Sequence, residues 1–209
     1  MRHPAPTPSD PPLPLQPPRV EHRRQTAGPI HLDPLAIDAF NALVHRLHPD
    51  APHVDADALA SMARWLQAQP PAQAAALLHS RLGRLAELRA MRRDTAWPLD
   101  PAQAARIDAL VDYVRREDDL IPDGVPLFGA LDDALLLELA WPMLADDVDD
   151  YRDFCRFRDD AGAVLGRAVN QADWLRARGE EGALWEQLHR VHAHAYVQHE
   201  APARMFRVS

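Results

Sequence analysis

The sequence predicts an all-α protein, a bundle of about seven helices that follows a disordered, proline-rich N-terminal tail. Three observations support this prediction. After residue 32, apolar residues recur at intervals of three and four along most of the chain, which is the spacing of one helix face. Alternating apolar and polar runs, which are typical of strands, are absent. Several of the apolar stretches begin at Asp-Pro or Pro-Pro, and these pairs favour a helix start.

The tail comprises residues 1–32. It holds nine of the twenty prolines and few apolar side chains. Such a segment cannot bury enough apolar surface to offset the entropy that it would lose on ordering. We therefore expect residues 1–32 to be disordered, either as a plain linker or as a proline-rich ligand for a partner.

The N-terminal helical region, residues 33–100, contains three predicted helices. They start at Asp33-Pro34, near Asp55 and at Pro70-Pro71. The third helix also has a basic side, which is either a solvated face or a set of partners for the acidic loop within the fold. Its arginines are Arg81, Arg84, Arg89, Arg92 and Arg93.

Residues 101–145 are predicted to form a helix, a loop and a second helix. The first helix starts at Asp100-Pro101, and two prolines and two glycines break the helical pattern between residues 118 and 132. The second helix, 132–144, is apolar on nearly every side, so we expect it at the centre of the protein. Asp132 or Asp133 is its predicted N-cap, and Pro142 should kink or end it. Residues 146–200 are predicted to add three amphipathic helices to the same core.

The composition excludes several kinds of site. The chain has no lysine, so a Schiff-base lysine, a P-loop lysine and a Ser-Lys dyad are excluded. No serine lies in a Gly-x-Ser-x-Gly context, Cys155 is the only cysteine, and no Gly-x-Gly-x-x-Gly is present. These absences argue against a serine hydrolase, a cysteine zinc site and a dinucleotide fold. The sequence identifies no catalytic residue and favours a protein that is not an enzyme.

Charge and hydropathy limit the kinds of partner and the cellular compartment that we expect. The net charge of −8 argues against a nucleic-acid partner. The N-terminus lacks the apolar segment of a secretory signal, and no apolar run is long enough to span a membrane. We expect a cytoplasmic protein with no transmembrane segment, and attachment to the inner membrane as a peripheral protein is the alternative. The absence of lysine beside abundant Ala, Arg, Pro and Asp indicates a GC-rich bacterial genome.

The most informative segment is the acidic, proline-bound loop 118–133. Eleven acidic residues and no arginine lie between Glu117 and Tyr151. The string Asp119-Leu-Ile-Pro-Asp-Gly-Val-Pro-Leu-Phe-Gly-Ala-Leu-Asp-Asp133, followed by a leucine-rich helix, resembles the YkvA-like family of bacterial domains of unknown function. The match covers roughly residues 101–145. The family has an apolar helix ending in Ser-Pro where this chain has Arg116-Glu117-Asp118, which weakens the membrane association that some relatives suggest. The resemblance implies a fold segment and no activity.

Two hypotheses account for the acids of this region. Hard divalent cations such as Mg²⁺ or Ca²⁺ take several carboxylate ligands, and the candidate ligands are Asp119, Asp123, Asp132, Asp133 and Glu138. The alternative gives each acid a local structural role. Asp123 makes a turn, Asp119 bonds loop amides, Asp132 or Asp133 caps the helix, and Glu138 pairs with an arginine from another helix. A buried carboxylate must be paired, protonated or bound to metal, so the partner of Glu138 discriminates between the hypotheses.

A second candidate surface is a stripe on the last helix. Its residues recur at helical spacing, and they are Trp185, His189, His192, Tyr196 and His199. His189 and His192 are three residues apart and are a candidate pair of metal ligands. The alternative is an amphipathic aromatic face that packs on a neighbour or on a partner protein.

The leading functional hypothesis is therefore a non-enzymatic helical module that binds an unknown protein partner through the acidic loop 118–133 and nearby apolar surface. It requires no cofactor. The first alternative is a protein, or an enzyme, that depends on a divalent cation held by the loop carboxylates. The second alternative is a peripheral membrane protein.

Overall fold

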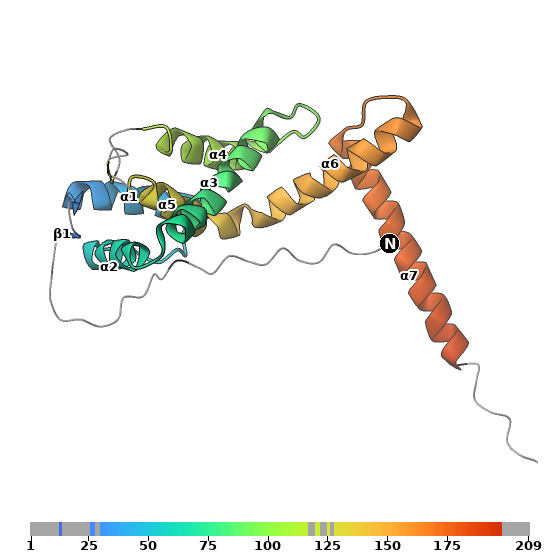
Figure 1. Cartoon of the computed structure of the whole chain (residues 1–209). Helices are drawn as coiled ribbons and strands as arrows, with labels where there is room; N and C mark the ends of the chain where they lie inside the picture. Colours follow the sequence, from blue (N-terminus) through green and yellow to red (C-terminus); the bar gives the residue numbers. More distant parts are fainter. Residues whose placement is uncertain are drawn as a thin grey trace, which may run out of the picture. The chain divides into compact units, whose positions relative to one another are not determined.

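The computed structural model describes residues 13, 26–27, 30–116, 120–121, 125 and 128–197, and it leaves out the side chains of residues 26–31, 165 and 189–197. Within these residues the structure is all-α, as predicted. It contains seven α-helices, one short 3-10 helix and one antiparallel pair of two-residue strands (Figure 1). In this described part of the chain, no helix combines the length and the apolar character needed to cross a bilayer.

The chain forms two compact units, Met1–Arg152 and Asp153–Ser209, whose boundary falls inside helix α6 (Ala145–Leu165). The first unit contains α1 (Pro34–Leu47), α2 (Ala56–Gln67), α3 (Pro71–Arg93), α4 (Pro101–Tyr113) and α5 (Leu131–Ala140). The second unit contains the rest of α6 and α7 (Gln171–Val197). The packing of residues 146–200 on the core of the preceding helices stays a prediction.

Aspartate caps start α1, α2 and α4 at the places that the sequence predicted. Asp33 and Asp55 each accept a hydrogen bond from a backbone N–H of the first helical turn. Asp100 accepts from the N–H of Gln103, and the Gln103 side chain accepts in return from the N–H of Asp100. This reciprocal pair is a capping box, which satisfies two backbone donors that a helix start otherwise leaves without partners.

Helix α5 is the centre of the first unit, as its apolar sequence predicted. Nine of its ten residues are buried, and it packs against α1, α3 and α4. It ends at Ala140 and continues as the 3-10 helix η1 (Trp141–Met143). Pro142 lies in η1, two residues past the end of α5, and it agrees with the predicted stop, because proline has no N–H for an α-helical hydrogen bond.

The predicted N-cap of α5 is wrong. The helix begins at Leu131 with Ala130 as its cap residue and no side-chain cap, so Asp132 and Asp133 lie in the first turn. The preceding turn leads directly into the helix, because the N–H of Leu131 donates to the carbonyl of Phe128. With the cap position already passed, both aspartates are buried instead of turned back toward the helix start.

The three helices predicted after residue 145 are two. The stretch from Leu165 to Leu175 contains the turn between α6 and α7 and is not a separate helix between them. Gly166 follows α6 directly and has a φ of 61°, a left-handed conformation that glycine adopts at helix ends without steric cost. Asn170 and Asp173 then exchange backbone-to-side-chain hydrogen bonds at the start of α7. The apolar spacing across this turn therefore belongs to two helices.

The segment predicted as a tail is described only at residues 13, 26–27 and 30–32, and the rest of it lies outside the described residues. Strands β1 (Thr26–Ala27) and β2 (Ile30–His31) pair antiparallel before α1. Leu13 and Leu32 are both 3% exposed. Parts of this segment therefore contact the folded protein, which the low apolar content of residues 1–32 did not predict.

Candidate functional site

Glu138, the residue chosen to discriminate between the two hypotheses, pairs with an arginine. Its Oε2 accepts a hydrogen bond of 2.5 Å from Nε of Arg81 on α3, and the side chains of Arg81 and Glu138 are 2% and 16% exposed. Arg81 also donates from Nη1 to the carbonyl of Leu77, one turn earlier on its own helix. The structural interpretation of Glu138 thus agrees with the geometry, because a guanidinium compensates the carboxylate charge where a cation would otherwise be needed.

The second oxygen of Glu138 also has a donor. The backbone N–H of Leu13 donates to Oε1 at 2.7 Å, and the two residues are 125 positions apart in the sequence. The carboxylate therefore joins three parts of the chain: α5, α3 and the N-terminal segment.

Asp132 connects α5 with α4 and with the loop between them. Its Oδ2 accepts hydrogen bonds from the hydroxyl of Tyr113 at 2.9 Å and from the backbone N–H of Ile121 at 3.2 Å. Asp132 is 1% exposed. A short acidic side chain that bonds a loop amide is the behaviour expected if the loop acids are structural.

The other loop acids are less informative. Asp133 is 7% exposed, whereas Asp119 and Asp123 lie outside the described residues. Among the residues that the structure does describe, no group of three or more His, Cys, Asp or Glu side chains has the arrangement to hold a metal ion. The proposed convergence of all five acids on a divalent cation stays a prediction, although Glu138 is paired with Arg81.

The stripe on α7 is described only at its beginning. Trp185 is 65% exposed, and its neighbours Leu184 and Leu188 are 58% and 48% exposed. The backbone of His189, His192 and Tyr196 is helical, but their side chains are outside the description, and His199 is outside the described residues altogether. The candidate metal pair and the aromatic face on this helix stay predictions.

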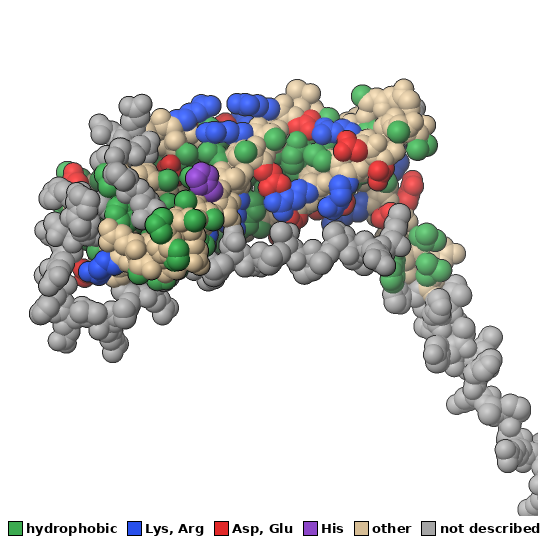
Figure 2. Space-filling view, in the orientation of Figure 1, with side chains coloured by type: hydrophobic (Ala, Val, Ile, Leu, Met, Phe, Trp, Pro, Cys, Tyr) green, Lys and Arg blue, Asp and Glu red, His purple; other side chains and the backbone are tan. Residues whose placement is uncertain are grey.

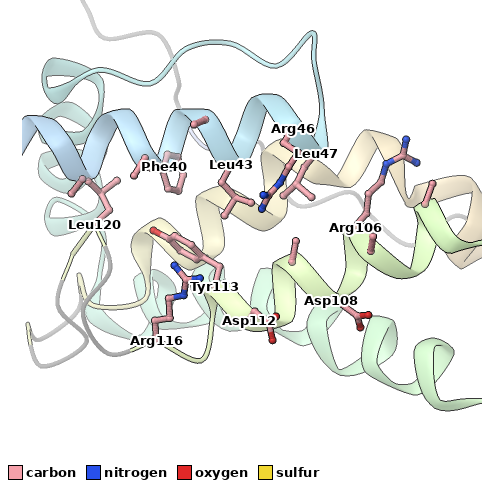
Figure 3. A pocket seen from close by; sticks show the side chains of 16 residues that line it. Phe40, Leu43, Arg46, Leu47, Arg106, Asp108, Asp112, Tyr113, Arg116 and Leu120 are labelled. Atoms are coloured by element: carbon pink, nitrogen blue, oxygen red, sulfur yellow. The ribbon is translucent and has the colours of Figure 1, made fainter.

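A groove of about 1090 Å³ runs between α1 and α4, and both helices pack against α5. Figure 3 shows Phe40, Leu43 and Leu47 pointing from α1 toward α4. The edge-to-face contact of Phe40 with Tyr113, with ring centroids 5.8 Å apart, joins the two helices at one end. Leu120, from the loop, also lines the groove.

Small side chains line both walls of the groove and leave the space between them open. The α1 wall carries Ala36, Ala39 and Leu43, and the α4 wall carries Ala102, Ala105 and Ala109. On both helices these positions are separated by three and then four residues, which is the spacing of a seam between packed helices. This spacing is the sequence signal that could have identified the groove, but the alanines were hidden among the stronger apolar stripes of the same helices.

Charged side chains border the groove, with more positive than negative groups. Arg46, Arg106, Arg116, Asp108 and Asp112 line it. Asp108 is engaged outside the groove, because both of its oxygens accept hydrogen bonds of 3.0 Å from Arg92 on α3. The hydrogen bond from Arg92, together with the attraction of the two charges, raises the pKa of Arg92. The groove therefore presents a net positive border in a chain whose formal net charge is −8.

The predicted basic side of α3 is not a uniform solvated face. Arg81 is buried against Glu138, the guanidinium of Arg84 lies 4.5 Å from the ring centroid of Trp141, and Arg92 pairs with Asp108. Figure 2 shows basic and acidic side chains next to one another on part of the visible face. Three of the five arginines therefore have partners within the fold, and these three partners lie outside the acidic loop 118–133.

Comparisons with known proteins identify no relative: no family model matches the chain, and no curated protein or solved structure is similar to it. The resemblance of residues 101–145 to the YkvA-like family therefore stays a prediction that rests on the residue string alone.

Proposed function

We propose that the protein is a non-enzymatic helical interaction module and that it binds an amphipathic helix of a partner protein in the groove between α1 and α4. The observation that carries the proposal is the lining of this groove. Two helices present small and apolar residues at the spacing of a helix seam, and no third helix of the described first unit covers them. A helix laid into an apolar groove is a common mode of peptide recognition.

The lining of the groove favours a helix over a small molecule. Pockets for small molecules bury most of the ligand, whereas this groove is lined along its length by residues of α1 and α4, including the exposed Ala39 and Ala105. Alanine walls allow a third helix to approach closely, and leucine or methionine side chains from that helix would fill the space above α5.

The border of the groove specifies the charge of the partner. Arg46, Arg106 and Arg116 outnumber the two aspartates, of which Asp108 is already paired with Arg92. A partner helix with an apolar stripe and acidic flanking residues would complement these arginines, and such complementarity chiefly increases specificity and the rate of association.

The acidic loop 118–133 borders the proposed binding surface. Arg116 lies two residues before this loop and Leu120 belongs to it, and both line the groove. Asp132 fixes Ile121 to α4 and α5 through its hydrogen bonds. In this proposal the loop is a structural border of the groove, and the YkvA-like resemblance describes the α4–loop–α5 segment that builds one wall. Our proposal places the contact with the partner along the helices.

A substitution in the groove tests the proposal. Peptides of helical pattern are selected from a displayed library on the full chain, and their affinity is measured by fluorescence anisotropy. Ala105→Trp fills the groove from an exposed position, and we expect it to weaken binding at least about tenfold. Ala86→Trp places the same side chain on an exposed position of α3 outside the groove, and we expect it to leave the affinity unchanged.

The selected peptides should also share a pattern. We expect an apolar stripe at three- and four-residue spacing with acidic flanks, and Arg106→Glu should weaken their binding most at low salt. Equal effects of Ala105→Trp and Ala86→Trp, or a selection that yields no such pattern, would contradict the proposal.

A further inference from the structure

The N-terminal segment supplies a buried side chain, Leu13, at a position well before the first helix in the sequence. Leu13 is 3% exposed, although the sequence around it is Pro11-Pro12-Leu13-Pro14. Its backbone N–H donates to Oε1 of Glu138 at 2.7 Å. A proline-rich stretch with few apolar side chains gains little from collapse, so the burial of this leucine needs a specific explanation.

The flanking prolines determine which atom of the segment can bond. Proline has no backbone N–H, so Leu13 carries the only backbone donor between Pro11 and Pro14. Pro14 also restricts Leu13 to extended conformations. The segment therefore offers one apolar side chain and one N–H on a backbone with few accessible conformations, which is how proline-rich ligands limit the entropy lost on binding.

The Glu138 carboxylate, which accepts the hydrogen bond from Leu13, is itself held in one orientation. Arg81 is 1% exposed and holds Oε2 of Glu138 through Nε, while its Nη1 donates to the carbonyl of Leu77. These bonds orient the carboxylate and leave Oε1 for a donor from outside α3 and α5. A charged acceptor makes a shorter and stronger hydrogen bond than a neutral one. Oε1 of Glu138 therefore favours a ligand that has a free N–H over one that has none.

We propose that Glu138, oriented by Arg81, is the centre of a second binding site, which recognises an extended peptide with a leucine between prolines. In the structure Leu13 of the same chain occupies this site. A partner that carries such a segment must displace Leu13, so the N-terminal segment is a built-in competitor. The site is separate from the α1–α4 groove, because neither Glu138 nor Arg81 lines that groove, and the two proposals can fail independently.

Tethering explains why the chain's own segment would prevail. Leu13 lies twenty positions before Asp33, the cap of α1, on the same chain, and a tethered ligand acts at an effective concentration that a free peptide has to exceed. A free peptide of the same sequence should therefore bind weakly to the wild-type chain and more tightly once Leu13 can no longer occupy the site.

The test uses the full-length chain and a fluorescent peptide with the sequence of residues 9–18, Ser-Asp-Pro-Pro-Leu-Pro-Leu-Gln-Pro-Pro. Leu13→Asp in the protein removes the apolar anchor, and we expect it to tighten peptide binding at least about tenfold relative to wild type. Gln16→Asp adds the same charge to the same segment and should behave as wild type. A peptide in which aspartate replaces the leucine at position 13 should not bind either protein.

Each other outcome contradicts the proposal. If Leu13→Asp does not increase the affinity, or if Gln16→Asp increases it equally, the leucine is not the competing ligand. A measurement on the wild-type chain is independent of how the variants fold. The amide of Leu13 should exchange with solvent at least about tenfold more slowly than in an unfolded chain, and an unprotected amide would overturn the proposal.

Discussion

At the scale of single residues, buried carboxylates form hydrogen bonds with groups that are distant from them in the sequence. Glu138 interrupts a helix that is otherwise buried, yet Arg81 compensates its charge and Leu13 occupies its second oxygen. Asp132 uses one oxygen to bond both Tyr113 and Ile121. Each carboxylate thereby holds together segments of the chain that are not neighbours in the sequence.

The Arg81–Glu138 pair leads to a stability prediction. Arg81→Met leaves the Glu138 carboxylate without its cationic partner in a largely buried position, and we expect a loss of about 3–5 kcal/mol in the free energy of unfolding. The double variant Arg81→Met, Glu138→Leu replaces both groups with apolar side chains and should recover most of that loss. Urea denaturation followed by circular dichroism measures both values. A single variant that loses less than about 1 kcal/mol would show that water compensates the carboxylate.

A second prediction concerns the pH dependence at the start of α7. Hydrogen bonds from Arg167 and from the backbone N–H of Asn170 lower the pKa of Asp173 from 3.8 to about 2. Because the folded-state pKa is lowered, the stabilisation is fully present above the ordinary pKa of Asp173 and is lost as the pH falls from about 4 to about 2. Carboxyl-carbon NMR on the full chain should give a midpoint near 2 for this residue.

The matched variants for this titration are two arginine substitutions. Arg167→Gln removes the largest cause of the shift and should return the pKa of Asp173 toward 3.8. Arg176 is the more distant partner at 3.6 Å, so Arg176→Gln should change the pKa much less. A wild-type midpoint near 3.8, or equal effects of the two variants, would show that the Arg167 hydrogen bonds do not form in solution.

At the scale of helices, side chains and turns close in the sequence determine where a helix begins or ends. Packing against the core determines which face of the helix is buried. Asp33, Asp55 and Asp100 cap helices within the next few residues, so the sequence predicted those starts. The start of α5 was missed because a turn, not a side chain, leads into it. The helix count after residue 145 was wrong because apolar spacing continues across a turn at Gly166.

Gly166 gives a prediction at this scale. Its φ of 61° is unfavourable for any residue with a Cβ, although nothing lies within 4 Å of a Cβ placed there. Gly166→Ala should therefore destabilise the protein by about 1–2 kcal/mol through backbone strain alone. Gly162→Ala lies inside α6, also in open space, and should stabilise it by roughly 0.5–1 kcal/mol. Urea denaturation compares the two variants, and shifts of the same sign would contradict the left-handed turn.

At the scale of the whole molecule, the first unit is organised around α5, and its surfaces result from the helices that pack there. The two surfaces to which we assign binding both depend on α5: the groove is formed by two helices that pack against α5, and Glu138 belongs to α5. Since a buried central helix fixes its neighbours, it also fixes the spacing of the groove walls and the position of the carboxylate.

The sequence by itself determined the fold class, most helix starts and the central position of α5. These features depend on contacts within about four residues or on the apolar content of one segment, and both are visible in the sequence. Only the tertiary structure decided that Arg81, 57 residues from Glu138, is its partner, that Leu13 is buried, and that α1 and α4 leave a groove between them. The reason is physical: any of five arginines on α3 could have met the carboxylate, and only the packing of α3 against α5 selects one.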